Sequence, residues 1–125
     1  MKNGKLQVGI IGCGGIANQK HLPALKNQAD KADMAAFCDI IVERAQKAAE
    51  EYGVEGAKVY EDYKELLADP EIDVVHVLTP NVAHCPITCD AFAAGKHVMC
   101  EKPMAHNTES AKKMMEAWKA SGKKF

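Results

Sequence analysis

Apolar residues along the chain gather in short runs, separated by stretches in which they recur every three or four positions. Runs of this kind, apolar nearly throughout, are typical of strands buried on both faces of a parallel sheet. They cover residues 7–11, 34–38, 58–60, 73–78 and 96–100. Because strands alternate with helical stretches, we expect right-handed crossovers and a three-layer, doubly wound α/β fold. Residues 1–125 are expected to form a single domain.

The stretches between the runs predict helices with recognisable ends. Residues 42, 45, 49 and 52 form an apolar stripe that Gly53 closes. A second helix begins at Asp62, where Asp62 and Glu65 resemble a capping box, and stops before Pro70. Pro86 predicts a further helix that becomes regular near Cys85. The last stripe, at residues 111, 114, 115 and 118, is closed by Gly122.

The first strand leads directly into a glycine-rich turn that opens a helix. Residues 12–17 fit the pattern G-x-G-x-x-A of dinucleotide-binding turns. Gly12 permits a tight turn, Gly14 lets a pyrophosphate approach the backbone, and Ala17 lets the helix pack closely on the strand. The alternative is that the glycines only make a turn. The predicted phosphate-binding residues are Gly12, Gly14, Gly15, Ile16 and Ala17.

Asp39 lies 22 residues after Ala17, at the end of the second predicted strand. A carboxylate at that place can accept hydrogen bonds from the two hydroxyls of an adenine ribose and repels a 2′-phosphate. The sequence therefore favours NAD over NADP, although Arg44 could hold a 2′-phosphate and keeps NADP possible. The alternative for Asp39 is a helix N-cap.

The composition argues against several classes of function and does not indicate a specific chemistry. The net charge of −1, with 47% hydrophobic and 26% charged residues, gives no basis for a nucleic-acid partner. No apolar stretch approaches the roughly 20 residues that a membrane span needs, so we expect a cytoplasmic protein. Five cysteines, an odd number without a C-x-x-C pair, favour reduced thiols. Cys85 and Cys89 beside His84 are too few ligands for us to predict a metal site.

Two further segments carry a more specific pattern. Residues 79–84 read Thr-Pro-Asn-Val-Ala-His, and residues 94–103 read Ala-Gly-Lys-His-Val-Met-Cys-Glu-Lys-Pro. With the opening turn, they resemble the glucose–fructose oxidoreductase, inositol dehydrogenase and rhizopine-catabolism family (Gfo/Idh/MocA), over essentially the whole chain. The resemblance implies a Rossmann domain followed by an α+β domain, and oxidation or reduction of a hydroxyl carbon in a sugar, inositol or related polyol.

The same resemblance implies roles for single residues. Glu101 and Lys102 would lie beside the nicotinamide, with Lys102 as the catalytic residue that reaches the nicotinamide ribose and the substrate hydroxyl, and with a cis Lys102–Pro103 peptide. The alternative for Lys102 is a solvated loop lysine. The remaining residues implied to lie near the nicotinamide side of the cofactor are Thr79, Pro80, Asn81 and His84. Asn81 could also cap the next helix, and His21 and His76 are expected to be structural.

The end of the chain repeats the helix-to-strand pattern of residues 94–98, which predicts a chain truncated before its last strand and a C-terminal α+β domain. With the usual strand order 3-2-1-4-5-6, the fifth strand would then have a bare edge, so we expect a homo-oligomer that associates through residues 98–100 or the helix carrying Trp118. We expect cofactor binding without useful turnover.

Two other functions stay open at this stage. An NAD(H)-sensing regulatory module has no need of a reactive-side lysine such as Lys102, and a methyltransferase that uses S-adenosylmethionine usually has an acidic residue just before the glycine turn, where this chain has Ile10 and Ile11.

Overall fold

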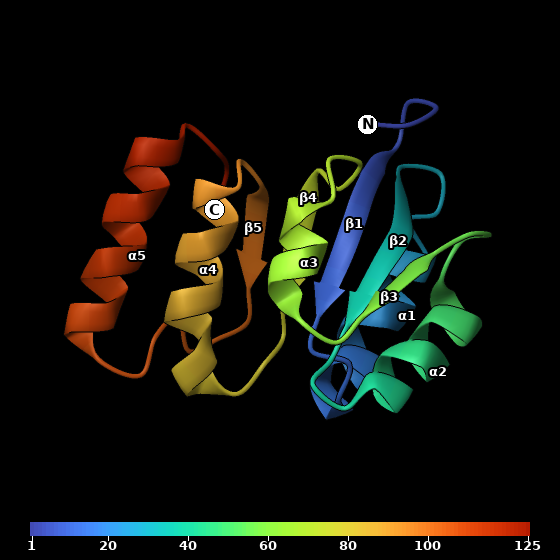
Figure 1. The fold of residues 1–125 in the computed structure, drawn as a ribbon, viewed down its shortest axis with the longest axis horizontal. Helices are drawn as coiled ribbons and strands as arrows, with labels where there is room; N and C mark the ends of the chain where they lie inside the picture. Colours follow the sequence, from blue (N-terminus) through green and yellow to red (C-terminus); the bar gives the residue numbers. More distant parts are fainter.

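One sheet of five parallel strands organises residues 1–125, all of which the computed structural model describes (Figure 1). The strands lie in the order β3-β2-β1-β4-β5, so the winding reverses between β1 and β4. They are β1 (Leu6–Ile11), β2 (Ala32–Cys38), β3 (Lys58–Tyr60), β4 (Val74–Val77) and β5 (His97–Cys100). Each predicted strand is confirmed, with ends that differ by up to two residues, and so is the expected order of the five.

The connections between the strands are helical. They are the π-helix η1 (Ala17–His21), α1 (Leu22–Lys26), α2 (Val42–Tyr52), α3 (Tyr63–Ala68), the 3₁₀ turn η2 (Asn81–Ala83), α4 (His84–Ala93) and, after β5, α5 (Thr108–Ser121). Asp62 caps α3 by accepting the Lys64 N–H, and Gly122 ends α5 at a φ of +67°. The predicted stripe of α2 faces the core, where Ala45 is buried and Ala49 and Tyr52 pack against the buried residues, and Ala48 is buried beside them.

Two apolar cores lie on opposite faces of the sheet. Val8 and Ile10 of β1 pack with η1, α1 and α2, whereas Ile11 packs with α3 and α4. This alternation is the period of two that a strand imposes on its side chains. In β2 the register shifts after Met34, so one extra residue lies opposite β1 as a bulge. The result is the predicted three-layer arrangement of helices, sheet and helices.

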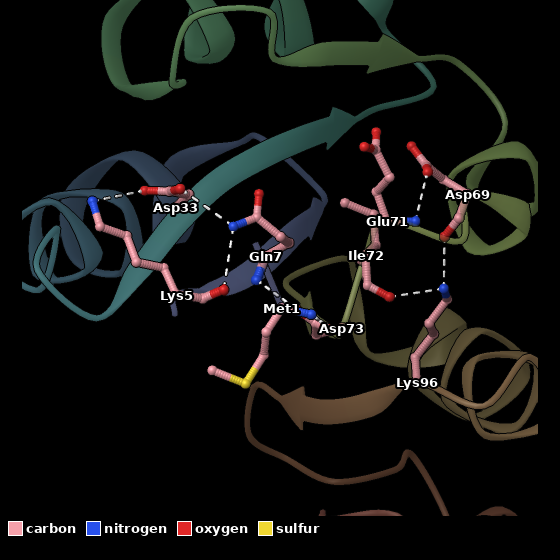
Figure 2. A network of polar contacts seen from close by, with 9 residues as sticks. All are labelled: Met1, Lys5, Gln7, Asp33, Asp69, Glu71, Ile72, Asp73 and Lys96. Atoms are coloured by element: carbon pink, nitrogen blue, oxygen red, sulfur yellow. Dashed lines mark hydrogen bonds and ion pairs between the residues drawn. The ribbon is translucent and has the colours of Figure 1, made fainter. Parts of the chain in front are cut away.

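The amino ends of the strands are closed by a polar network (Figure 2). Lys96 is only 6% exposed, and its ammonium donates to the carbonyl oxygens of Asp69 at 2.7 Å and Ile72 at 2.8 Å. Burial lowers the pKa of this lysine. Beside it, the Asp73 carboxylate accepts the Gln7 N–H at 2.8 Å and ties β1 to the start of β4. The polar side chains at this edge are therefore bonded to other groups of the chain.

The outer edge of β5 is not entirely bare, because the Val98 N–H donates to the Lys124 carbonyl at 3.0 Å. Self-association through this edge or through α5 stays a prediction. None of the helices has the length and apolar character to cross a membrane.

Candidate functional site

A cavity of about 580 Å³ opens at the carboxyl ends of β1, β2 and β4, the lower edge of the sheet in Figure 1. It lies where the winding of the sheet reverses, which is where open α/β sheets bind ligands. Its wall includes seven of the residues predicted from the sequence: Gly12, Gly14, Gly15, Asp39, Arg44, Thr79 and Pro80. The remaining predicted residues lie elsewhere.

The glycine turn presents an open surface to this cavity. Gly12 has a φ of +97°, and a Cβ there would lie 2.8 Å from the carbonyl carbon and oxygen of Leu78. A Cβ at Gly14 or Gly15 would meet nothing within 4 Å. Gly12 is therefore required by the backbone, whereas Gly14 and Gly15 leave room for a ligand close to the main chain. The first N–H groups of the helical segment that follows have no partner within it.

Asn18, which was not predicted from the sequence as a site residue, stabilises the glycine turn through two hydrogen bonds. Its side-chain amide donates to the carbonyl oxygens of Cys13 at 2.9 Å and Gly14 at 2.8 Å. Ala17 is fully buried in the core and Ile16 is exposed, so Ala17 serves the close packing expected of it. An asparagine one turn into a helix is the signal that could have identified this contact.

Asp39 joins the turn to the start of α2. One carboxylate oxygen accepts the Cys13 N–H at 2.9 Å and the other accepts the Ile41 N–H at 2.8 Å. The N-cap of α2 is Ile41, so the alternative role of Asp39 as N-cap is wrong. Each carboxylate oxygen keeps a second lone pair, and the residue lines the cavity. The exposed Arg44 lines the same wall, which therefore offers both a carboxylate and a guanidinium.

The thiols near the cavity are not nucleophiles. Burial raises the pKa of both Cys13 and Cys38 to about 12, with a smaller contribution from the charge of Asp39. Both thiols therefore stay protonated at neutral pH and pack as small apolar groups.

Some of the residues after β4 line the cavity, and another connects the end of β4 to the loop after β5. Thr79 and Pro80 line the cavity, and Asn81 is exposed in η2 without a side-chain capping bond, so its alternative role as a cap is wrong. His84 is fully buried, with Nδ1 at 2.8 Å from the Pro103 carbonyl and Nε2 at 2.8 Å from the Thr79 carbonyl. Its ring has no free nitrogen for a ligand and instead joins the end of β4 to the loop after β5.

The loop after β5 carries Glu101, Lys102 and Pro103, and the Lys102–Pro103 peptide is cis, as the resemblance implied. Lys102 is exposed and lines a shallower depression beside α5 with Cys100, Met104, Met115, Trp118 and Phe125. Neither Glu101 nor Lys102 lies on the wall of the larger cavity. The structure thus separates the predicted reactive side from the predicted phosphate and ribose side.

His76, in the middle of β4, makes the fold sensitive to acid. Burial, together with the charge of His21, lowers the pKa of His76 from 6.5 to about 4. Between these pH values the unfolded chain binds more protons than the folded one, so stability falls as the pH falls. We expect a loss of roughly 2 kcal/mol between pH 7 and pH 5, measured by urea unfolding.

His76→Leu should remove most of that pH dependence. The carboxylates with lowered pKa values, Asp69, Asp73 and Glu101, titrate below this window because their unfolded pKa values are 4.5 or less. An unchanged pH dependence in the variant would exclude His76 as its source.

Residues 6–125 match a protein-family model described as an oxidoreductase family with an NAD-binding Rossmann fold. Inositol 2-dehydrogenase of Salmonella typhimurium is 38% identical over 120 residues, which are 96% of this chain and 35% of that protein. D-glucoside 3-dehydrogenase of Escherichia coli K12 is 38% identical over 123 residues, which are 98% of this chain and 34% of that protein. The chain therefore spans about a third of the length of these relatives.

Solved structures agree with the sequence relatives. The 3-ketoreductase KijD10 of Actinomadura kijaniata, in complex with NADP and TDP-benzene, superposes with a TM-score of 0.87 at 33% identity, covering 95% of this chain and 35% of that one. The WlbA dehydrogenase of Chromobacterium violaceum, in complex with NADH and UDP-GlcNAcA, superposes with a TM-score of 0.88 at 33% identity, covering 98% and 34%. The chain belongs to the Gfo/Idh/MocA family of oxidoreductases, and its sheet is the NAD-binding Rossmann fold of that family.

Proposed function

We propose that this chain is the dinucleotide-binding domain of an NAD(P)-dependent oxidoreductase that acts on the CH–OH group of a sugar, an inositol or a related polyol. The observation that carries the proposal is the cavity in which the open glycine turn, Asp39 and the end of β4 face one space. The substrate class is supported by the relatives, an inositol 2-dehydrogenase and a D-glucoside 3-dehydrogenase.

The residues present fit a dinucleotide. The N–H groups that follow Gly14 would donate to the pyrophosphate, which the missing side chains of Gly14 and Gly15 allow to approach. Asp39 would accept hydrogen bonds from the adenine ribose hydroxyls with its second lone pairs. Thr79, Pro80 and Asn81 would border the nicotinamide half, which supplies hydride transfer when bound.

Lys102 would act on the substrate side of the nicotinamide. Its ammonium can stabilise negative charge that develops on the reacting oxygen, and it can hold or pass on the hydroxyl proton. Glu101 would not contact the cofactor in the larger cavity, because it does not line that cavity and its carboxylate oxygens accept hydrogen bonds from His21 and from the Lys102 N–H. Glu101 and His84 would then contribute by holding the two loops in place.

Replacing Asp39 by alanine is expected to weaken NADH binding more than NADPH binding. The variant loses charged hydrogen bonds worth about 1.5–3 kcal/mol, which raises the Kd for NADH by roughly tenfold to a hundredfold. For NADPH the loss is smaller, because the same change removes repulsion of the 2′-phosphate. Titration of nicotinamide fluorescence with both cofactors measures the difference.

Arg44→Ala is the matched variant on the same wall of the cavity. It should weaken NADPH binding and leave the Kd for NADH within about twofold, since only the 2′-phosphate offers the guanidinium a charged partner. Equal losses for both cofactors in Asp39→Ala would mean that the carboxylate acts only through its hold on the Cys13 and Ile41 N–H groups.

The proposed function is tested by titrating the chain with NADH, NADPH and S-adenosylmethionine in parallel. Binding of a nicotinamide dinucleotide without binding of S-adenosylmethionine is the expected result, and no affinity for either dinucleotide in a folded sample would contradict the proposal. With sugars and polyols the chain alone is expected to show no useful turnover, whereas the complete enzyme is expected to turn over. A complete protein that binds NADH but converts none of these substrates would favour the NAD(H)-sensing module instead.

A further inference from the structure

Three side chains from separate segments of the chain form a hydrogen-bonded series that ends at Lys102. Nδ1 of His76, in β4, lies 3.4 Å from Nδ1 of His21, at the end of η1. Nε2 of His21 lies 2.6 Å from Oε2 of Glu101, and Oε1 of Glu101 accepts the Lys102 N–H at 2.9 Å. His76 is 7% exposed, and the side chains of His21 and Glu101 are 17% and 20% exposed. The series therefore runs from the interior of the sheet to its carboxyl edge.

The chemistry of the partners determines where the protons lie. The Glu101 carboxylate only accepts, so Nε2 of His21 donates to it. The two facing Nδ1 atoms need one proton between them. Burial keeps the pKa of His76 at about 4, so at neutral pH that ring carries a single proton. When His21 is neutral, His76 donates to it, and every donor in the series points toward Glu101.

Glu101 is thereby held as an anion between two donors. The hydrogen bond from His21, followed by that from the Lys102 N–H, lowers the pKa of this carboxyl. An ionised acceptor shortens and strengthens both bonds. The His21–Glu101 pair spans 80 residues of sequence, so it fixes the loop after β5 against the first helical segment rather than against its own strand.

The residue after Lys102 is held as well. The Pro103 carbonyl lies 2.8 Å from Nδ1 of the buried His84, whose other nitrogen faces the Thr79 carbonyl. Lys102 thus stands between two residues that are each anchored by a histidine, with His21 acting through the Glu101 side chain on one side and His84 on the other. The residues on both sides of Lys102 are therefore held by other segments, whereas its own side chain is exposed.

We propose that His21 is a positioning residue for Lys102: by holding Glu101 it fixes the backbone from which the Lys102 ammonium reaches the reacting oxygen. The consequence for turnover rests on the proposed function, whereas the consequence for the loop does not. Without His21, Oε2 of Glu101 turns to water and the loop samples other conformations. A displacement of about 1 Å at a reacting group can reduce turnover by roughly a hundredfold.

The first experiment follows the backbone amide resonance of Lys102 by NMR in the 125-residue chain. His21→Phe keeps a ring of similar size but removes the donor, and should move this resonance and broaden it as the loop loses its fixed conformation. His21→Gln retains an N–H donor and should restore most of the wild-type position. His97→Phe, which changes a half-buried histidine of β5 bonded to the Lys124 N–H, is the control and should leave Lys102 unchanged. An unaltered Lys102 resonance in a folded His21→Phe sample would overturn the proposal.

The second experiment separates turnover from cofactor binding in the complete enzyme. His21→Phe should lower kcat by roughly a hundredfold, with the Kd for NADH within about twofold of wild type, and His21→Gln should recover most of the rate. Equal losses in kcat and in NADH affinity, or no recovery with glutamine, would overturn the positioning role and indicate general damage to the site. A wild-type protein that binds no NADH would instead overturn the proposed function, because the amide resonance reports the loop without cofactor.

Discussion

Replacing Lys102 by alanine in the complete enzyme is expected to reduce kcat by at least about a hundredfold while leaving NADH binding nearly unchanged. Removing a group that stabilises developing charge or transfers a proton typically costs about a hundredfold to ten-thousandfold in rate. Binding should be spared because Lys102 is exposed and does not line the larger cavity, where the glycine turn and Asp39 lie. The measurements are steady-state turnover on a sugar or polyol panel and NADH titration by fluorescence.

The control is Lys112→Ala, which removes an exposed lysine of α5 and should change neither quantity. Near-normal turnover in Lys102→Ala would restore the alternative of a solvated loop lysine. A loss of NADH affinity as large as the loss of rate would place the lysine on the cofactor rather than on the reacting oxygen.

The sequence predicted the sheet well because its signals are local. Each strand is a short apolar run, and the helix ends carry Asp62, Gly53 and Gly122, whose effects act within a few residues. For α2 the sequence identified the face that packs on the sheet but did not include Ala48. Ala48 and Ala49 are equally apolar in the sequence, and only the packing against β2 and β3 decides which of them is fully buried.

The candidate site was harder to predict from the sequence because its contacts join segments that are distant along the chain. A carboxylate at the end of β2 could be predicted, but not that its oxygens accept the Cys13 and Ile41 N–H groups. His21 is predicted from the sequence to be a structural histidine before Leu22, and only the fold brings Glu101, in the loop after β5, close to it. Both ring nitrogens of His84, implied to lie near the cofactor, instead lie 2.8 Å from backbone carbonyl oxygens. Side-chain partners of this kind depend on register and loop path.

The polar groups at the amino edge of the sheet stabilise the fold, whereas those at the carboxyl edge are available to a ligand. At the amino edge, the Lys96 ammonium and the Asp73 carboxylate are bonded to other groups of the chain, and Lys96 is only 6% exposed. At the carboxyl edge, Gly14 faces open space and Asp39 retains lone pairs. An edge with unused hydrogen-bonding capacity beside a cavity can bind a polar ligand without first breaking internal bonds. Substitutions at the glycine turn should therefore separate folding from binding.

Gly12→Ala is expected to destabilise the fold, whereas Gly14→Ala is expected to weaken NADH binding without destabilising the fold. At Gly12 a side chain meets a φ of +97° and the Leu78 carbonyl group at 2.8 Å, so we expect a loss of about 2–4 kcal/mol in the free energy of unfolding. This is a large part of the roughly 5–15 kcal/mol that stabilises a typical domain. Urea unfolding measures the loss, and NADH binding should fall with it because the turn is displaced.

At Gly14 a methyl group meets nothing within 4 Å and the φ lies outside the left-handed region, so stability should change by less than about 0.5 kcal/mol. The methyl group would instead occupy the space through which a pyrophosphate approaches the N–H groups, and the Kd for NADH should rise at least about tenfold, or 1.4 kcal/mol. Equal destabilisation of both variants would contradict the geometry of the turn. Normal NADH affinity in Gly14→Ala would contradict the proposal that the pyrophosphate approaches the main chain at Gly14.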